Sequence, residues 1–258
     1  MKVAIIGAGN MGGAIARGMA QGTRIMAKDI TVADPSQEKL QRLQLDYAEM
    51  KVTTDNQKAI EEAQLVFLVV KPWLVPEVLR ELQFKEDQTL ISVAAGVEIK
   101  ELRSFSNLPI PIYRLIPNTA ISELASVSLL SASEEVSQEL TDSILALLEE
   151  MGMALCLPEH LLGVGTALTS CGIAYVFKYI ESAARAGVEL GIPPRDAIRM
   201  VAKSVEGAAK IILNNETHPS LEIDKVTTPG GITIKGLNEL DHAGFTSAII
   251  RAMKVSSK

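Results

Sequence analysis

The first seventeen residues constrain the fold of this chain more than any other stretch. The apolar run Val3–Ile6 predicts a short strand, and Gly7-Ala8-Gly9-Asn10-Met11-Gly12 follows it directly. Apolar residues then recur at helical spacing, so the pattern is strand, glycine turn and helix. Gly7 permits the tight turn, Gly9 lets a diphosphate approach the backbone, and Gly12 allows the helix to pack closely on the strand. The unpaired N–H groups at the start of that helix are where a diphosphate is expected.

An acidic residue follows at the distance that a dinucleotide site requires. Residues 30–33 predict the next strand, and Asp34 lies 22 residues after Gly12. A carboxylate ~20 residues beyond the glycine turn typically accepts a hydrogen bond from the ribose of the cofactor. The alternative is that Asp34 only caps the helix that begins near Ser36. Together the two signals favour a dinucleotide-binding site.

The rest of the first half alternates between strand and helix patterns. Strands are expected around residue 52 and at 65–70, 89–93, 111–116, 127–130 and 154–157, and helices at 10–21, 36–47, 55–62, 76–82 and 134–151, the last ended by Gly152. The run at 65–70 is apolar on both faces, as in a central parallel strand that helices cover on each side. This alternation predicts an α/β fold, a doubly wound (Rossmann) sheet with right-handed crossovers.

Ligands of such sheets bind beyond the carboxyl ends of the strands. Val70, Lys71 and Pro72 follow the fourth predicted strand, and the small residues 94–97 follow the fifth. Small residues there would let a nicotinamide or its ribose lie against the backbone. The alternatives are an ordinary strand-to-helix loop and, for Lys71, a solvated charge.

The character of the chain changes at Pro158. Residues 159–191 predict a long helix without proline, apolar on nearly every side, and further helices are expected at 195–213, 218–224, 234–241 and 244–255. A helix that is apolar all round is buried on more than one side, in a domain core or a subunit interface. We therefore predict a dinucleotide-binding domain at residues 1–157 and an all-helical domain at 158–258.

A second turn, in the helical half of the chain, has residues that could bind a small anion. Residues 227–233 contain Pro229-Gly230-Gly231 and lead into a helix. Successive glycine N–H groups and the positive end of the helix would form a small pocket for a carboxylate, to which Thr228 and Thr233 add hydroxyls. The alternative is an ordinary capped helix with Thr233 as its N-cap.

Composition excludes several other classes of function. The 258 residues carry a net charge of −6 and no basic block, which argues against nucleic acid and anionic membrane surfaces as partners. Cys156 and Cys171 make neither a disulfide framework nor a zinc site, so a cytoplasmic protein is expected. No uninterrupted apolar run approaches 18 residues, and the glycine-rich start with Arg17 does not fit a signal peptide. The histidines are scattered, and no metal site or hydrolytic triad is indicated.

These motifs together resemble the pyrroline-5-carboxylate reductase family over essentially the whole chain. The most specific match is the segment at 226–240, Val-Thr-Thr-Pro-Gly-Gly-Ile-Thr-Ile-Lys-Gly-Leu-Asn-Glu-Leu. The segments at 7–12, 70–72, 94–96 and 174–177 also match, as does Arg114 with Pro117-Asn118-Thr119. The chain departs from the family pattern at Ser170-Cys171-Gly172-Ile173, where Gly-Ser-Gly-Pro is usual, and at Ile116 and Ala120.

The resemblance implies a doubly wound domain followed by an all-helical dimerisation domain. It implies reduction of L-1-pyrroline-5-carboxylate to L-proline by NADPH or NADH, in a homodimer that assembles further into a decamer of five dimers. The implied cofactor-binding residues are Ile6, Gly7, Ala8, Gly9, Asn10, Met11, Gly12, Asp34, Ser36, Asn56, Val69, Val70, Lys71, Pro72, Ala95 and Val97. The implied substrate-binding residues are Glu159, Thr228, Gly231, Ile232 and Thr233.

The chemistry of a cyclic imine points to one catalytic candidate. The imine accepts hydride once its nitrogen is protonated or hydrogen-bonded, and Thr233 is the candidate for that hydrogen bond. Since a carboxylate at Asp34 should repel a 2′-phosphate, NADH is expected to be preferred or comparably accepted, with Lys39 offsetting part of the repulsion. Two alternatives remain: another imine or β-hydroxyacid dehydrogenase of the same two-domain plan, and a nucleotide-sensing homologue without turnover.

Overall fold

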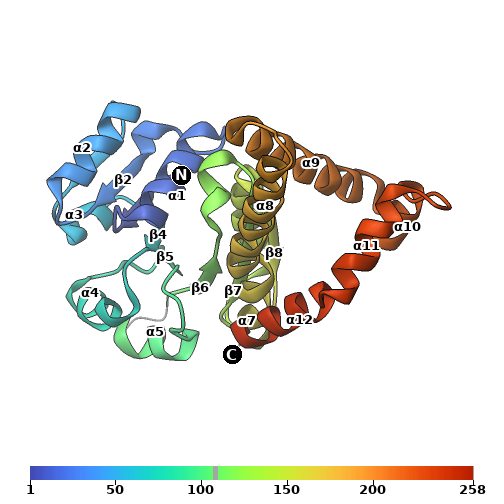
Figure 1. Cartoon of the computed structure of the whole chain (residues 1–258). Coiled ribbons are helices and arrows are strands. Elements are labelled where there is room, and N and C mark those ends of the chain that lie inside the picture. Colours follow the sequence, from blue (N-terminus) through green and yellow to red (C-terminus); the bar gives the residue numbers. More distant parts are fainter. Residues whose placement is uncertain (107–109, 258) are drawn as a thin grey trace. The chain divides into compact units, whose positions relative to one another are not determined.

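The chain forms two compact units, Met1–Ser170 and Cys171–Lys258, in a computed structural model that describes residues 1–106 and 110–257. A sheet with helices on both faces makes up the first unit, and helices make up the second (Figure 1). The predicted α/β class, a doubly wound sheet followed by a helical part, is therefore confirmed.

The eight-stranded sheet has the order β3-β2-β1-β4-β5-β6-β7-β8. Its strands are β1 (Val3–Ile6), β2 (Ile30–Ala33), β3 (Lys51–Thr53), β4 (Leu65–Leu68), β5 (Thr89–Ser92), β6 (Ile112–Ile116), β7 (Ser126–Ala132) and β8 (Gly152–Cys156). Strands β1 to β6 are parallel, β7 runs antiparallel to β6, and β8 runs parallel to β7. The first six strands thus follow the 3-2-1-4-5-6 order of dinucleotide-binding sheets.

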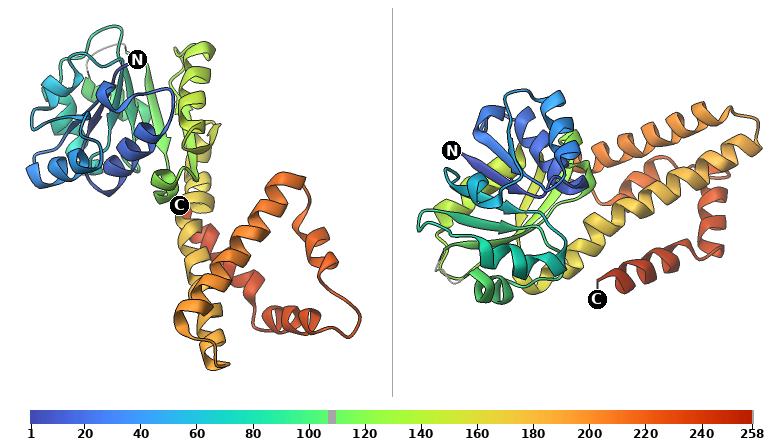
Figure 2. Two further views of the ribbon diagram at one scale, coloured as in Figure 1. Left: turned by 90° about the horizontal axis from the view of Figure 1, so that it is seen from above. Right: turned by 90° about the vertical axis from the view of Figure 1, so that its left-hand side faces the viewer.

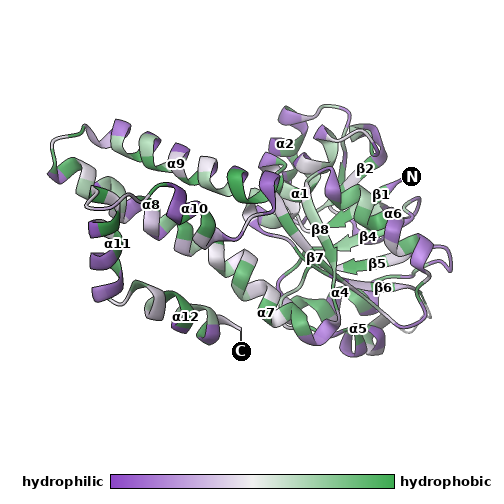
Figure 3. Ribbon diagram, turned by 90° about the vertical axis from the view of Figure 1, so that its right-hand side faces the viewer, coloured by the Kyte–Doolittle hydropathy of each residue, from purple (hydrophilic) through white to green (hydrophobic). Residues whose placement is uncertain are grey.

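Alternate residues of the strands enter two separate apolar cores. Ile5 and Phe67 belong to a core with α1 (Asn10–Gln21), α2 (Gln37–Asp46) and α6 (Gln138–Glu149). Ile6 and Leu68 belong to the other core, with α3 (Asn56–Ile60), α4 (Val75–Glu81) and α5 (Ile99–Ser106). Since successive side chains of a strand point to opposite faces, strands that are apolar throughout are needed here. Figure 3 shows these strands as the hydrophobic centre of the unit.

The helices and strands of the first half lie close to the positions that the sequence predicts. Helix α1 has the expected bounds and ends at Gly22, and Leu40 and Leu43 of α2 are buried. Asp55 caps α3, because its Oδ1 accepts a hydrogen bond of 3.0 Å from the backbone N–H of Lys58. Strand β4 is shorter than predicted, ending at Leu68, and a 3₁₀ turn, η2 (Pro72–Leu74), precedes α4.

Two sequence predictions were wrong in the second part of the sheet, and one helix there was not predicted. Helix α6 begins at Gln138 and not at residue 134, because the hydroxyl of Ser137 caps it by accepting from the N–H of Leu140. Gly152, predicted to end this helix, instead begins β8 with a φ of 134°, next to Ser126 of β7. Helix α5 was not predicted at all. Most of its residues are polar, so the few apolar ones, among them the buried Leu102, do not make a clear helical pattern in the sequence.

The long helix after Pro158 is interrupted. It runs as η4 (Glu159–Leu161), α7 (Leu162–Thr166), a π-helical turn (Ala167–Cys171) and α8 (Gly172–Glu189). Leu168 is 60% and Phe177 59% exposed in the single chain, so this segment is not a core of the chain itself, and of the two expected settings the subunit interface remains a prediction. By length and composition alone, Glu159–Glu189 would also be able to cross a membrane, with 22% of its most apolar window buried.

The second unit consists of α8, α9 (Pro194–Asn215), α10 (Pro219–Lys225), α11 (Ile232–His242) and α12 (Phe245–Ser256) (Figure 2). Helices α8 and α9 approach closely where Gly187 faces Ala197, because a Cβ at Gly187 would lie 3.3 Å from that of Ala197. The hydroxyls of Tyr175 and Ser256, 2.6 Å apart, connect α8 with α12. Helices α9 to α12 lie within a few residues of their predicted bounds, whereas α8 begins at Gly172 and not at residue 159.

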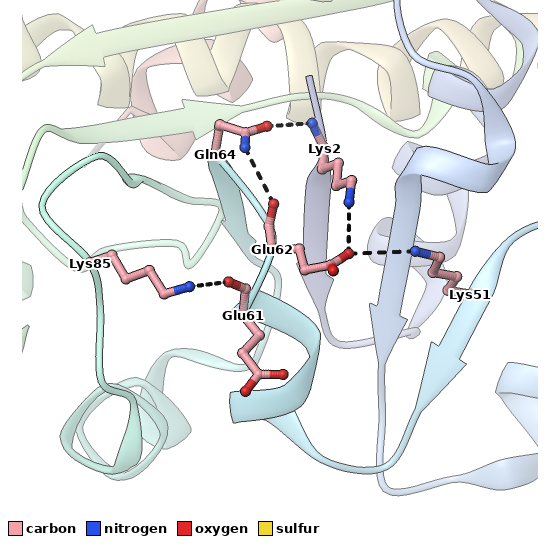
Figure 4. A network of polar contacts seen from close by, with 6 residues as sticks. All are labelled: Lys2, Lys51, Glu61, Glu62, Gln64 and Lys85. Atoms are coloured by element: carbon pink, nitrogen blue, oxygen red, sulfur yellow. Dashed lines mark hydrogen bonds and ion pairs between the residues drawn. The ribbon is translucent and has the colours of Figure 1, made fainter.

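An ion-pair network lies at the amino-terminal edge of the sheet (Figure 4). The carboxylate of Glu62 is 2.7 Å from Nζ of Lys2 and 3.7 Å from Nζ of Lys51. The hydrogen bond from Lys2 and the two positive charges lower the pKa of Glu62, although its side chain is exposed. These residues lie at the edge opposite to the strand ends where a ligand is expected, so the network is remote from the expected site.

Candidate active site

The glycine turn after β1 is packed so tightly that two of its glycines have no substitute. Gly7 has a φ of 105°, and an added Cβ would collide with the carbonyl oxygen of Val69. A Cβ at Gly12 would collide with the carbonyl oxygen of Gly7. The N–H of Gly7 donates to the carbonyl of Ala33 at 2.7 Å, which joins the turn to the end of β2. The turn is therefore held by the backbone on both sides.

Gly9 differs from Gly7 and Gly12 because the space where its Cβ would lie is open. A Cβ at this position would meet no atom within 4 Å. Gly9 is also the N-cap of α1, and no side chain caps this helix. The first N–H groups of α1, those of Asn10, Met11 and Gly12, therefore remain available to an anion next to open space. This geometry fits the diphosphate of a dinucleotide.

Asp34 is buried and already hydrogen-bonded. It is 5% exposed, and its Oδ2 accepts a hydrogen bond of 2.8 Å from the backbone N–H of Ala8. Its Oδ1 accepts from the N–H of Ser36 at 2.9 Å, and Nζ of Lys39 lies 3.3 Å away. The carboxylate thus ties the end of β2 to the glycine turn. Sequence reasoning placed Asp34 here but did not foresee its bond to Ala8.

The other predicted cofactor residues lie after the carboxyl ends of neighbouring strands. Ile6 ends β1, and its carbonyl accepts from the N–H of Val69 at 2.8 Å. Asn56 begins α3 after β3, and Val69, Val70, Lys71 and Pro72 follow β4. Ala95 and Val97 lie in the loop between β5 and α5, where Gly96 has a φ of 75°. Parallel strands place these segments along one edge of the sheet.

Glu159 is held by two hydrogen bonds. Its Oε1 lies 2.8 Å from Nη1 of Arg114 and accepts a second bond of 2.8 Å from the backbone N–H of Ile99. Its Oε2 has no such bond to any residue that the structure describes. Arg114 is 8% exposed, so the ion pair with Glu159 compensates a nearly buried charge. Sequence reasoning quoted Arg114 only as part of a motif and assigned it no partner.

The Thr228–Thr233 segment lies in the second unit. Gly230 has a φ of 72°, and the N–H of Gly231 donates to the carbonyl of Thr228 at 2.9 Å, closing a turn. Gly231 is the N-cap of α11, so the alternative with Thr233 as the cap is wrong, and Thr233 is the second residue of the helix. Thr228 and Thr233 are exposed, and Ile232 is 88% exposed. The uncapped helix start and two free-standing hydroxyls suit a small anion.

Family models cover both parts of the chain. The model described as pyrroline-5-carboxylate reductase dimerisation matches residues 159–258. The model described as NADP oxidoreductase, coenzyme F420-dependent, matches residues 2–96. The two matches coincide with the helical part and with the first strands of the sheet.

Curated relatives and solved structures extend the similarity over the entire chain. Pyrroline-5-carboxylate reductase 2 of Dictyostelium discoideum is 34% identical over 100% of this chain and 91% of its own length. Pyrroline-5-carboxylate reductase 1 of the same organism is 35% identical over 99% of this chain, which spans 48% of that longer protein. The crystal structure of 1-pyrroline-5-carboxylate reductase from Streptococcus pyogenes superposes with a TM-score of 0.88 at 33% identity, covering 100% of this chain and 96% of the other.

Proposed function

The chain belongs to the pyrroline-5-carboxylate reductase family, and we propose that it reduces 1-pyrroline-5-carboxylate to L-proline with a hydride from NADPH or NADH. The observation that carries the proposal is the match to this family along the whole chain, at 34% identity to a curated relative. The class of enzyme is an NAD(P)H-dependent oxidoreductase acting on a C=N bond.

The first unit would hold the cofactor. The open space at Gly9 and the uncapped start of α1 support binding of the diphosphate there. The residues proposed to surround the rest of the cofactor are Asp34, Ser36, Asn56, Val69 to Pro72, Ala95 and Val97. When bound, the dihydronicotinamide supplies a hydride from its C4 to the imine carbon. The loops after β4 and β5 would contribute by fixing the orientation in which C4 meets the substrate.

The second unit would hold the substrate. The carboxylate is proposed to accept hydrogen bonds from the backbone N–H groups of Ile232 and Thr233 and from the hydroxyl of Thr228. Gly231 supports this because a Cβ there would lie 2.6 Å from Oγ1 of Thr228 and would crowd the turn. The hydroxyl of Thr233 is proposed to donate, directly or through a water, to the lone pair of the neutral imine nitrogen, which polarises the C=N bond for the arriving hydride. Solvent can protonate the imine, which explains why no histidine is needed.

Glu159 is also proposed to bind the substrate. Its Oε1 is held by Arg114 and Ile99, whereas its Oε2 has no hydrogen bond within the described residues. A fixed carboxylate with one open oxygen suits a substrate whose ring nitrogen carries a positive charge. This role is carried over from the family resemblance.

The match to a dimerisation model implies that the chain forms oligomers. We propose a homodimer, with further assembly into a decamer, and a domain boundary near residue 157. The match of residues 159–258 to this dimerisation model supports a subunit interface at the exposed apolar residues of α8 and α9, among them Phe177, Ile198 and Leu213. The acidic net charge of −6 supports a small molecule over nucleic acid as partner, and a cytoplasmic location completes the proposal.

The test is a coupled set of assays on the purified chain. We expect oxidation of NADPH and NADH at 340 nm to depend on added pyrroline-5-carboxylate, with proline as product. In the reverse direction, thioproline or proline should be oxidised at high pH, whereas hydroxyacids should not. Binding of the cofactor without imine reduction would contradict the proposal in favour of a nucleotide-sensing protein. Oxidation of hydroxyacids alone would favour a different dehydrogenase.

A further inference from the structure

Glu159 lies where three elements of the first unit meet. It begins η4, three residues after the end of β8 at Cys156, Arg114 belongs to β6, and Ile99 is the first residue of α5. A single carboxylate oxygen, Oε1, accepts the hydrogen bonds from Arg114 and Ile99, each 2.8 Å long. We call these three residues the Glu159 cluster. The cluster joins the sheet, the start of α5 and the start of the long helical segment.

The cluster is too enclosed to be an incidental surface pair. The side chain of Arg114 is 10% exposed and that of Glu159 is 32% exposed. A guanidinium that is nearly buried requires a compensating charge, and removing that charge is costly. Surface pairs of this chain are different, since Arg42 and Glu38 of α2 are 70% and 74% exposed. The position of Glu159 is therefore strongly determined by its two donors.

The bond to Ile99 fixes one end of the proposed nicotinamide loop. This loop, residues 94–97, connects β5 to α5 and contains Gly96 in a left-handed conformation. At its start, the N–H of Val93 donates to the carbonyl of Leu68 at 2.9 Å. At its end, the N–H of Ile99 has Glu159 as its acceptor. Ala95 and Gly96 between these two points are exposed.

Arg114 supports the same loop from the sheet. It lies opposite Ser92, the last residue of β5, in the parallel register of β5 and β6. Arg114, which pairs with Glu159, is therefore in register with the end of β5, where the loop begins. Glu159 holds the end of the loop at Ile99, and Arg114 holds Glu159 to the sheet. A loop held in this way is preorganised for a ligand.

We infer that Arg114 and Glu159 are positioning residues for the cofactor, which hold the 94–97 loop in the conformation that receives the nicotinamide half of NAD(P)H. This inference rests on the proposed function. It differs from the substrate role of Glu159, because a contact with the substrate alone has no effect on the enzyme without substrate. Affinity for the cofactor in the absence of substrate therefore separates the two roles.

The experiment measures the Kd for NADPH without substrate and the steady-state constants with pyrroline-5-carboxylate. Glu159→Ala removes the acceptor of both bonds, and we expect its Kd for NADPH to rise about tenfold or more, as for the loss of one charge-assisted hydrogen bond. Arg114→Met should raise Kd in the same direction. Arg114→Lys retains a donor and should restore part of the affinity.

A matched control removes an ion pair at the opposite edge of the sheet. Glu62→Ala removes the acceptor of the bond from Lys2, as Glu159→Ala does for its own donors, and should leave the Kd for NADPH unchanged. If Glu159→Ala does not fold, because it leaves the nearly buried guanidinium of Arg114 without its counter-charge, Arg114→Met decides, since it removes the buried charge and leaves the partly exposed carboxylate of Glu159 in contact with solvent. A folded Glu159→Ala or Arg114→Met enzyme with unchanged Kd and a raised KM for the imine would overturn the inference. Failure of the proposed function has another signature, which is absence of imine reduction by the unaltered enzyme.

Discussion

Substituting alanine for Gly9 or for Gly12 tests the glycine turn, because we expect the first change to weaken cofactor binding and the second to lower stability. At Gly9 the backbone has a φ of −67°, which alanine adopts, and an added Cβ meets no atom within 4 Å. Gly9→Ala should therefore change the free energy of unfolding of the free protein by less than about 1 kcal/mol, the range of an N-cap change. Gly12→Ala drives its methyl group into the carbonyl of Gly7 and should cost about 1–3 kcal/mol or more.

Gly9→Ala, the variant with the smaller effect on stability, should have a large effect on the affinity for the cofactor. The methyl group of Gly9→Ala occupies the space through which the diphosphate reaches the N–H groups of α1. Losing one charge-assisted hydrogen bond costs about 1.5–3 kcal/mol, which corresponds to a Kd for NADPH raised roughly 10- to 100-fold. Gly9→Ala should thus be a stable protein that binds poorly. Gly12→Ala should melt several degrees lower, at about 2–4 °C per kcal/mol for a unit of this size.

The chain carries its own reporter for this measurement. Trp73 is the only tryptophan in the sequence, is 73% exposed and directly follows Pro72 of the proposed cofactor loop. Energy transfer from Trp73 to bound NADPH gives Kd, and thermal unfolding without ligand gives stability. A Gly9→Ala protein that binds NADPH as tightly as the unaltered chain would refute the assignment of the diphosphate to this turn.

Further predictions concern Thr233, Asp34 and Glu206. Thr233→Ala should lower kcat with the Kd for NADPH unchanged, whereas Thr233→Ser should retain most of the rate; equal turnover by all three forms removes Thr233 from catalysis. NADH should be used at least as well as NADPH, and Asp34→Asn should shift kcat/KM towards NADPH; a large advantage of NADPH in the unaltered enzyme contradicts this. Hydrogen bonds from flanking lysines lower the pKa of Glu206 to about 2, so its contribution to stability is present above its ordinary pKa of 4.5 and lost as the pH falls through about 2. An NMR titration of the Glu206 carboxyl group checks the lowered pKa, and unfolding of Glu206→Gln measured between pH 2 and 5 should lack this contribution.

The sequence predicted those parts of the fold that depend on neighbouring residues. The strand at Val3–Ile6 and the helix at residues 10–21 both follow from local patterns, and the structure has them. Helix α6 was predicted four residues too early because Glu134 and Glu135 are as compatible with a helix as with the loop. Only the bond between Ser137 and Leu140 decides where the helix begins.

Long-range packing accounts for the remaining differences. Gly152 resembles a helix stop in sequence, but its positive φ serves the close approach of β8 to Ser126 of β7. The bond of Asp34 to Ala8 and that of Glu159 to Ile99 join residues 26 and 60 positions apart, and no local spacing announces them. The candidate residues were thus predictable from motifs, whereas the hydrogen-bond partners that give them their positions required the structure.

The two central strands have a consequence for measuring what binds to this protein. Every residue of β1 and β4 is buried, and each strand is paired on both sides within the sheet. Their amide hydrogens should exchange with deuterium only when the whole first unit opens. Exchange rates at Val3–Ile6 and Leu65–Leu68 therefore record the global stability of that unit. Slower exchange there on adding a small molecule would report its binding to the native state without any enzymatic turnover.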